Sequence, residues 1–267
     1  MTNLLRSELF RLRKRPQTWW LLIVLVALEV MLYGIMVIVS FASSDPSSVN
    51  DNFRLPKIYD AGLIILALAG SVLAIIFASS ILGSEYGWNT LRPLLARSKS
   101  RASLLTAKWV TVALYSLVLA VVGVLTAMIA SVVSSLIVGV NSGFSGSTLI
   151  DFIAISARYF TAFLPYAALA MLLAVVTRSN TAGIAIAIAI NFLESGVFGL
   201  LGALSDFFHT LEKGGLAWNS SQVALYGGDN DVTRSQALIS AGVVAIYVAI
   251  FIIISFRVFD RRDVTSG

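Results

Sequence analysis

Six long apolar runs constrain this chain more than any other feature of its sequence. They extend over Trp19–Phe41, Ala61–Gly83, Leu104–Val138, Phe152–Val176, Ala182–Leu204 and Ala237–Phe259. A helix needs about 20 apolar residues to cross the roughly 30 Å hydrocarbon layer of a bilayer. Strands of a membrane β-barrel instead alternate in polarity over about ten residues, which these continuous runs do not. The pattern predicts an all-α, six-helix polytopic membrane protein.

The composition supports the same fold class. Hydrophobic residues make up 58% of the chain and charged residues 12%, whereas a soluble domain has about 25% charged residues. The chain has no cysteine, which excludes disulfides and thiolate metal sites. Between the runs there is no segment large enough to fold by itself, so residues 1–267 are expected to form a single transmembrane domain.

Lysine and arginine divide unequally between the two sides of the predicted bundle. Fourteen of the 19 fall on the side of the termini, and four fall on the other, with Arg158 near the outer end of the fourth run. The fourteen are Arg6, Arg11, Arg13, Lys14, Arg15, Arg92, Arg97, Lys99, Arg101, Lys108, Arg178, Arg257, Arg261 and Arg262. Because basic residues stay in the cytosol, both termini are predicted to be cytosolic and the protein to lie in the cytoplasmic membrane.

Residues 1–18 are predicted to form an amphipathic helix in the plane of the lipid headgroups. At 100° per residue its leucines share one broad arc, and basic residues occupy most of the rest, a pattern typical of helices that bind membrane lipids. The leucines are Leu4, Leu5, Leu9 and Leu12. Pro16 is expected to end this helix, and Trp19 with Trp20 to anchor the first span. The alternative is a disordered basic anchor.

Two carboxylates fall within the apolar runs. Glu29 lies about ten residues beyond Trp19, hence roughly 15 Å deep. Glu194 lies near the centre of the fifth run, three residues after Asn191 and on the same helix face. Charged groups at such depth are costly and commonly line a transport path or couple protons. Glu29, Asn191 and Glu194 are therefore candidates for a translocation path, with protonated carboxyls bonded to a neighbouring helix as the structural alternative.

Two of the polar segments between the runs carry features that bear on function. Residues 84–103 lie on the cytosolic side, where Thr90 is placed to cap, and Pro93 to begin, a short helix that extends to about Arg97. A simple basic loop is the alternative. Residues 205–236 form a long extracytoplasmic loop in which Phe207, Phe208, Leu211 and Trp218 are expected to enter the outer membrane interface.

The sequence SEYGWNTLRPLLARSKSRASLLTAKW, residues 84–109, resembles the cytosolic loop between the second and third helices of ATP-binding cassette (ABC) transporter permeases of the type-2 export class (ABC-2 type). In that family an acidic residue is followed by Gly-Thr-like and Leu-Arg residues, a short helix, a Ser-Arg turn and a lysine that opens the next span. Asn89 stands where glycine is common. The matching positions are Glu85, Thr90, Leu91, Arg92, Ser100, Arg101 and Lys108. The six-span layout, the N-terminal helix and the long outer loop extend the resemblance to the whole chain.

The resemblance implies the permease subunit of an ATP-driven exporter, a dimer with a second permease copy or a homologous permease. A short coupling helix would dock on a separate cytosolic ABC ATPase, with Glu85 and Arg92 positioning its ends and Leu91, Leu94 and Leu95 filling an apolar groove. The chain lacks a Gly-x4-Gly-Lys-Ser/Thr phosphate loop, so ATP and Mg²⁺ are expected in that partner and no enzyme activity or nucleic acid binding in this subunit. The alternatives are an ion-coupled secondary transporter and a non-transporting scaffold subunit. The sequence does not identify the substrate.

Overall fold

The computed structural model describes residues 2–42, 53, 57–91, 93–94, 100–140, 148–202, 210–227 and 232–261. Within these ranges it forms eight named helices and no strand, which confirms the all-helical prediction. The helices are α1 (Thr2–Lys14), α2 (Pro16–Ala42), α4 (Lys57–Gly87), α6 (Arg101–Val138), α7 (Thr148–Thr177), α8 (Asn180–Gly202), α10 (Leu216–Leu225) and α11 (Arg234–Arg261).

Five of these helices are long and apolar enough to cross a membrane: α2, α4, α6, α7 and α11. They correspond to the first, second, third, fourth and last predicted runs, so the chain is a multi-pass membrane protein. The fifth run forms α8, whose apolar part Asn180–Glu194 is shorter than the other five. Its Gly183–Ile190 stretch, in which isoleucine alternates with a small residue, is helical. The fifth predicted span is thus helical, and that it crosses the membrane stays a prediction.

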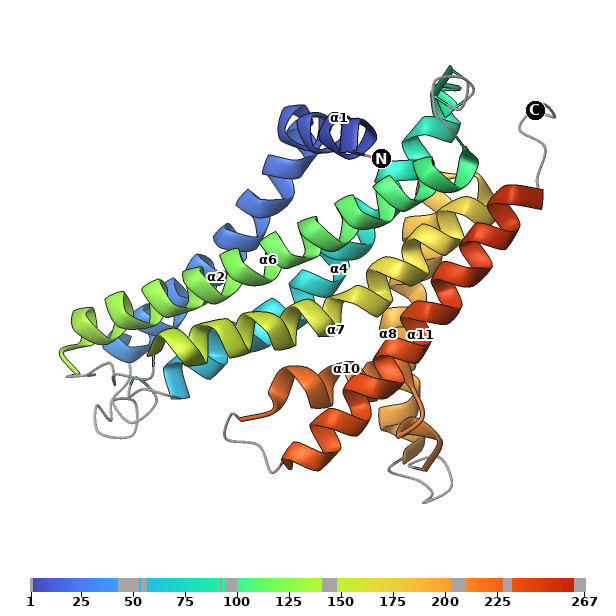
Figure 1. The fold of residues 1–267 in the computed structure, drawn as a ribbon. Coiled ribbons are helices and arrows are strands. Elements are labelled where there is room, and N and C mark those ends of the chain that lie inside the picture. Colours follow the sequence, from blue (N-terminus) through green and yellow to red (C-terminus); the bar gives the residue numbers. More distant parts are fainter. Residues whose placement is uncertain are drawn as a thin grey trace.

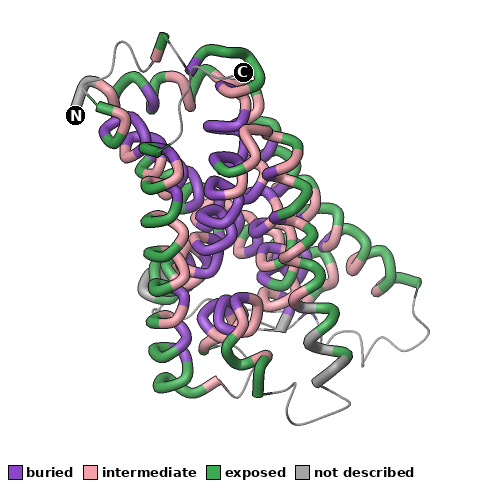
Figure 2. The backbone as a smooth tube through the Cα atoms, turned by 90° about the vertical axis from the view of Figure 1, so that its right-hand side faces the viewer, coloured by how far each residue is buried: buried purple, intermediate pink, exposed green. Residues whose placement is uncertain are grey.

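The helices pack around α4 and α7, which supply most of the core. Among the described helices, α7 makes extensive contacts with α4, α6, α8, α10 and α11. The extensive contacts of α2 are with α4 and α6. Figure 2 shows buried residues along the centre of the bundle and exposed ones along its outer helices. The exposed faces of α2 and α11 carry apolar side chains such as Ile38, Leu238 and Ile246, which suit contact with lipid.

The start of α1 and the end of α11 lie at the same end of the bundle, together with the end of α4 and the start of α6 (Figure 1). α1 lies across this end, and the helix path breaks at Arg15 before Pro16 opens α2. Proline fits the first position of a helix because its missing N–H would have no partner there. The predicted break at Pro16 is therefore confirmed, and α1 ends at Lys14 rather than continuing to residue 18.

α6 is the longest helix, and its two ends are defined by local chemistry. At its start the Ser100 side chain accepts the backbone N–H of Ser103, and the Ser103 side chain accepts the N–H of Ser100, which is a capping box. At its end Gly139 has a φ of 81° and closes the last turn. Its 38 residues correspond to about 57 Å, well beyond the hydrocarbon thickness.

Candidate functional site

A buried ion pair joins the end of α4 to the start of α6. The Lys108 Nζ atom lies 2.6 Å from Glu85 Oε1 and also donates to the carbonyl of Ile81 at 3.2 Å. Lys108 is fully buried and Glu85 is 2% exposed. A buried charge requires a close partner, because removal from water costs several kcal/mol per ion. This pair therefore holds the two helices together next to the polar segment that connects them.

α1 completes the cluster with one charge of each sign. Glu8 is 3% exposed, and its Oε2 atom lies 3.7 Å from Lys108 Nζ. Arg11 lies 3.5 Å from Glu8 and 3.8 Å from Glu85. The four charges of Glu8, Arg11, Glu85 and Lys108, which we call the junction cluster, sum to zero. They connect three elements, α1, α4 and α6, at the end of the bundle where α1 starts and α11 ends.

The turn from α1 into α2 is fixed beside this cluster. The Tyr115 hydroxyl of α6 donates to the carbonyl of Thr18 at 2.9 Å, and its ring stacks on Phe77 of α4 with centroids 3.7 Å apart. The Trp19 indole N–H donates to the carbonyl of Arg13 at 3.0 Å. These contacts set the angle between α1 and α2.

A cavity of about 330 Å³ opens between α1 and the chain that follows α4. It is lined by Arg11, Arg15, Glu85, Trp88, Thr90, Pro93 and Leu94. Glu85 thus belongs to both the junction cluster and the cavity wall. Its second oxygen, Oε2, is buried and makes no hydrogen bond within the part of the chain that the structure describes.

The predicted coupling residues occupy different environments. Leu91 is 2% exposed and packs in the chain's own core, so in this conformation it does not offer its side chain to a groove on another protein. Leu94 is half-buried, and its N–H bonds to the carbonyl of Thr90 at 3.3 Å. Arg101 donates to the carbonyl of Asp260 at the end of α11, at 3.3 Å. Arg92 and Leu95 lie outside the described residues, as does most of the predicted short helix.

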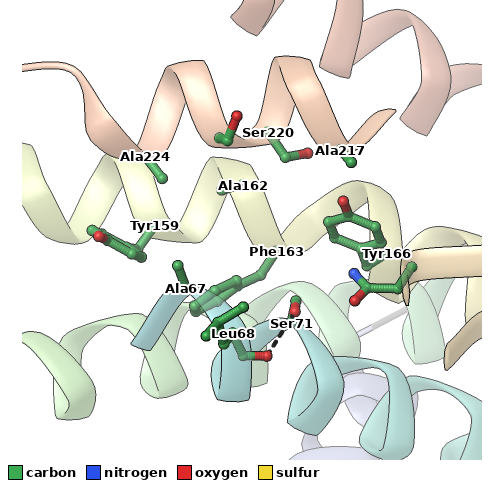
Figure 3. Close-up of a pocket in the computed structure, with 12 residues that line it drawn as sticks. Ala67, Leu68, Ser71, Tyr159, Ala162, Phe163, Tyr166, Ala217, Ser220 and Ala224 are labelled. Carbon is green, nitrogen blue, oxygen red and sulfur yellow. Dashed lines mark hydrogen bonds between the residues drawn. The ribbon is translucent and has the colours of Figure 1, made fainter. Parts of the chain in front are cut away.

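The three residues predicted for a translocation path are not brought into one cavity. Asn191 lines a cavity of about 150 Å³ together with Ser71, Tyr166 and Ser220, at the meeting of α4, α7, α8 and α10 (Figure 3). Neither Glu29 nor Glu194 lines it. The Asn191 residue also interacts with another group of the chain, so it is not without a partner.

Glu29 is fully buried near the middle of α2. Neither of its carboxyl oxygens makes a hydrogen bond within the described ranges. Tyr33, one turn further along α2, donates instead to the carbonyl of Ile58 at the start of α4, at 3.0 Å. An acid in this position is consistent with a neutral, protonated carboxyl group.

Glu194 binds the backbone of a neighbouring helix. The N–H groups of Leu216 and Ala217, in the first turn of α10, donate to its carboxylate, the latter at 3.0 Å. Gly215 lies so close that a Cβ there would come within 2.5 Å of Glu194 Oε1. The first N–H groups of a helix have no partner inside it, and a carboxylate satisfies them well. The geometry of Glu194 therefore supports the structural interpretation.

Sequence reasoning did not identify Glu8 as a member of the site. The spacing that places Glu8 on the buried face is visible in the sequence, since Leu4, Glu8 and Leu12 are four residues apart and share one face of α1. Leu4 and Leu12 pack against the core, and Glu8 between them is buried with them. Within the described ranges no group of three or more His, Cys, Asp or Glu side chains is placed to hold a metal ion.

Comparison with known protein families gives one match over most of the chain. The family described as "Protein of unknown function (DUF2705)" matches residues 20–265. The chain belongs to this family. The DUF2705 match contains Glu85 and Lys108 and begins after Glu8 and Arg11. No curated protein matches the chain.

Replacing Glu194 of this DUF2705 protein with alanine is expected to loosen the start of α10. Loss of a capping acceptor typically costs about 1 kcal/mol, which corresponds to roughly fivefold faster hydrogen exchange at Leu216 and Ala217. Exchange measured by mass spectrometry on the purified protein tests this. Glu194→Gln is the matched control, since it keeps an acceptor oxygen and should change exchange less. Equal, unchanged exchange in both variants would contradict the capping role.

Proposed function

We propose that this protein is the permease subunit of an ATP-driven ABC exporter of the cytoplasmic membrane. In this proposal six helices span the membrane, both termini are cytosolic, and the protein pairs with a second permease copy or a homologous permease. A separate cytosolic ATPase holds ATP and Mg²⁺. The observation that carries the proposal is the junction cluster, which binds α1, α4 and α6 to one another beside the segment that would contact the ATPase.

The junction suits the transmission of force. A push on residues 88–100 acts on both α4 and α6, because the segment joins their ends. The pair of Glu85 and Lys108 keeps those ends at a fixed distance, and the capping box at Ser100 gives α6 a rigid start. α4 in turn packs along α7 and α8. Displacement of the segment would therefore move spanning helices rather than a flexible loop.

The surface charge at this end also favours a partner outside the membrane. Fourteen of the 19 lysine and arginine residues are assigned to it from the sequence. Positive charge favours a cytosolic location for this end, and its exposed members, such as Arg13 and Lys14, are available to an acidic docking surface, whereas Lys108 is buried in the junction cluster. Because Leu91 is buried, our proposal gives the apolar contact with the ATPase to Leu94 and Leu95 rather than to all three leucines.

Purification of the tagged full-length protein from its native host is the direct test. We expect a nucleotide-hydrolysing subunit to copurify and the complex to hydrolyse ATP. Arg92→Ala and Leu94→Ala should each reduce recovery of the ATPase by about tenfold, the effect of truncating an interface residue worth more than 1 kcal/mol. Leu211→Ala, at the opposite end of the bundle, is the matched control. Full ATPase recovery with both variants would refute docking at this segment.

Glu29 favours a second candidate, an ion-coupled transporter. A buried acid without a hydrogen-bond partner among the described residues, in the middle of a span, is a place where a proton can bind and leave. Proton uptake into vesicles that contain the purified chain alone, and its loss in Glu29→Gln, would support this candidate. Absence of both proton uptake and a copurifying ATPase would leave the scaffold subunit as the remaining function.

A further inference from the structure

A wall of the cavity beside α1 includes a residue with a buried acceptor oxygen that receives no hydrogen bond. Glu85 Oε1 binds Lys108, whereas Oε2 has no hydrogen-bond partner in the described chain, although the side chain is only 3% exposed. Leaving a buried charged acceptor unpaired costs more than about 1–3 kcal/mol. Glu85 lines the cavity, so rotation of its carboxyl group would bring this buried oxygen to an occupant, and a hydrogen bond donated there would remove that cost.

The charges around the cavity define a second property of the occupant. The junction cluster is neutral as a set, since Glu8 and Glu85 balance Arg11 and Lys108. Arg15 lines the same cavity and adds one positive charge. The complementary ligand therefore carries one negative charge and at least one neutral hydrogen-bond donor. A phosphodiester with attached hydroxyl groups has this combination, and guanidinium groups are well suited to phosphate oxygens.

The position of the cavity favours a lipid over a soluble anion. Aromatic side chains are exposed at this end of the bundle, and such side chains gather at the level of the lipid headgroups. They are Phe10, Trp19, Trp20 and Trp88. Trp88 itself lines the cavity, and α1 lies across the same end (Figure 1). Basic pockets at this depth between membrane helices commonly hold anionic headgroups.

We propose that this cavity binds the headgroup of an anionic phospholipid that carries free hydroxyl groups, of the phosphatidylglycerol type. The phosphate faces Arg15 and Arg11, and a headgroup hydroxyl donates to Glu85 Oε2. The bound lipid connects α1 to the chain after α4 and completes the hydrogen bonding of the junction cluster. The cavity shares Thr90 and Leu94 with the segment proposed to dock on the ATPase, but the lipid site is argued from the geometry of the cavity and does not rest on the exporter function.

A lipid series tests the two recognition elements separately. The delipidated full-length protein is titrated in detergent with phosphatidylglycerol, phosphatidylmethanol, phosphatidylcholine or free glycerol phosphate, and bound ligand is counted by native mass spectrometry. Phosphatidylmethanol has the same charge as phosphatidylglycerol but no hydroxyl group. We expect phosphatidylglycerol to bind at least about tenfold more tightly, the value of a hydrogen bond to a charged group. Equal affinity would overturn the role of Glu85, and saturable binding of glycerol phosphate at the same strength would show a soluble anion instead of a lipid.

Two arginine variants locate the binding to the cavity. Arg15→Gln should lower phosphatidylglycerol affinity about five- to tenfold, since one basic group near the surface contributes about that factor. Arg13→Gln removes the same charge from an exposed position on α1 that does not line the cavity, and it should leave affinity unchanged. Equal losses in both variants would show general surface attraction and refute the site. Should Arg15→Gln fold poorly, the comparison of phosphatidylglycerol with phosphatidylmethanol on the unmodified protein decides the matter.

Discussion

Replacing Lys108 with methionine is expected to destabilise this protein more than any other single charge removal in the described part of the chain. Lys108 is fully buried and lies within 4 Å of two carboxylates, Glu85 and Glu8. Methionine fills a similar volume but leaves those carboxylates without their shared cation. Removing one partner of a buried ion pair typically costs about 3–5 kcal/mol. The measurement is the melting temperature of the purified protein in detergent.

Two further variants separate loss of the ion pair from loss of a lysine. Lys14→Met changes an exposed lysine at the end of α1 whose Nζ lies 5.8 Å from the Phe10 ring centre, and it should lower the melting temperature little. Adding Glu85→Gln to Lys108→Met should recover part of the lost stability, because it removes a buried carboxylate that has lost its closest partner and, in the described part of the chain, keeps only Arg11 at 3.8 Å. A Lys108→Met protein as stable as Lys14→Met would contradict the assignment of the junction cluster as a structural centre.

The membrane explains why the helices could be predicted from the sequence. In hydrocarbon every backbone N–H and C=O must bond within the chain, so a continuous apolar run of sufficient length has few options besides a helix. Pro16 predicted the break after α1 for an equally local reason, since proline lacks an N–H. The capping box at Ser100 and Ser103 also depends only on neighbouring residues.

Partners that are distant in the sequence could not be predicted in the same way. Glu8 and Lys108 are 100 residues apart, and the sequence around either residue does not indicate that the two form an ion pair. The position of Glu194 within the fifth apolar run could be read from the sequence, but its partner is the backbone of α10, which has no sequence signature as a donor. Leu91 was predicted to face outward on a polar segment, yet the fold turns it into the core. These outcomes are set by tertiary packing.

Replacing Gly83 with valine is the second change with a large expected effect, because it forces two helix backbones apart. An ideal Cβ at Gly83 would lie 2.6 Å from the Cα atom and 2.8 Å from the N atom of Asn180, at the start of α8. Both are main-chain atoms, so no side-chain rotation can relieve the overlap. Inserting atoms into a packed interior typically costs about 1–3 kcal/mol and more where backbone must shift.

A set of hydrogen bonds next to Gly83 depends on the same close approach of the two helices. Ser79 donates to the carbonyl of Asn180 at 3.0 Å, Ser80 donates to its side-chain oxygen at 3.2 Å, and Gln17 donates to Ser80 at 2.8 Å. Separation of α8 from α4 would break this chain of hydrogen bonds between α2, α4 and α8. Hydrogen exchange over the first turns of α8 should therefore increase in Gly83→Val, together with a lower melting temperature.

Gly87→Val provides the matched control for this prediction. Gly87 lies four residues later on the same helix, on the same face, and a Cβ there would meet nothing within 4 Å. Both variants exchange glycine for the same β-branched residue and add the same volume. Gly83 lies one turn inside α4, whereas Gly87 is its last residue, where helix propensity contributes less. Any excess loss of stability in Gly83→Val then measures the cost of separating α4 from α8. Equal melting temperatures and equal exchange in the two variants would show that the two helices do not depend on this close approach.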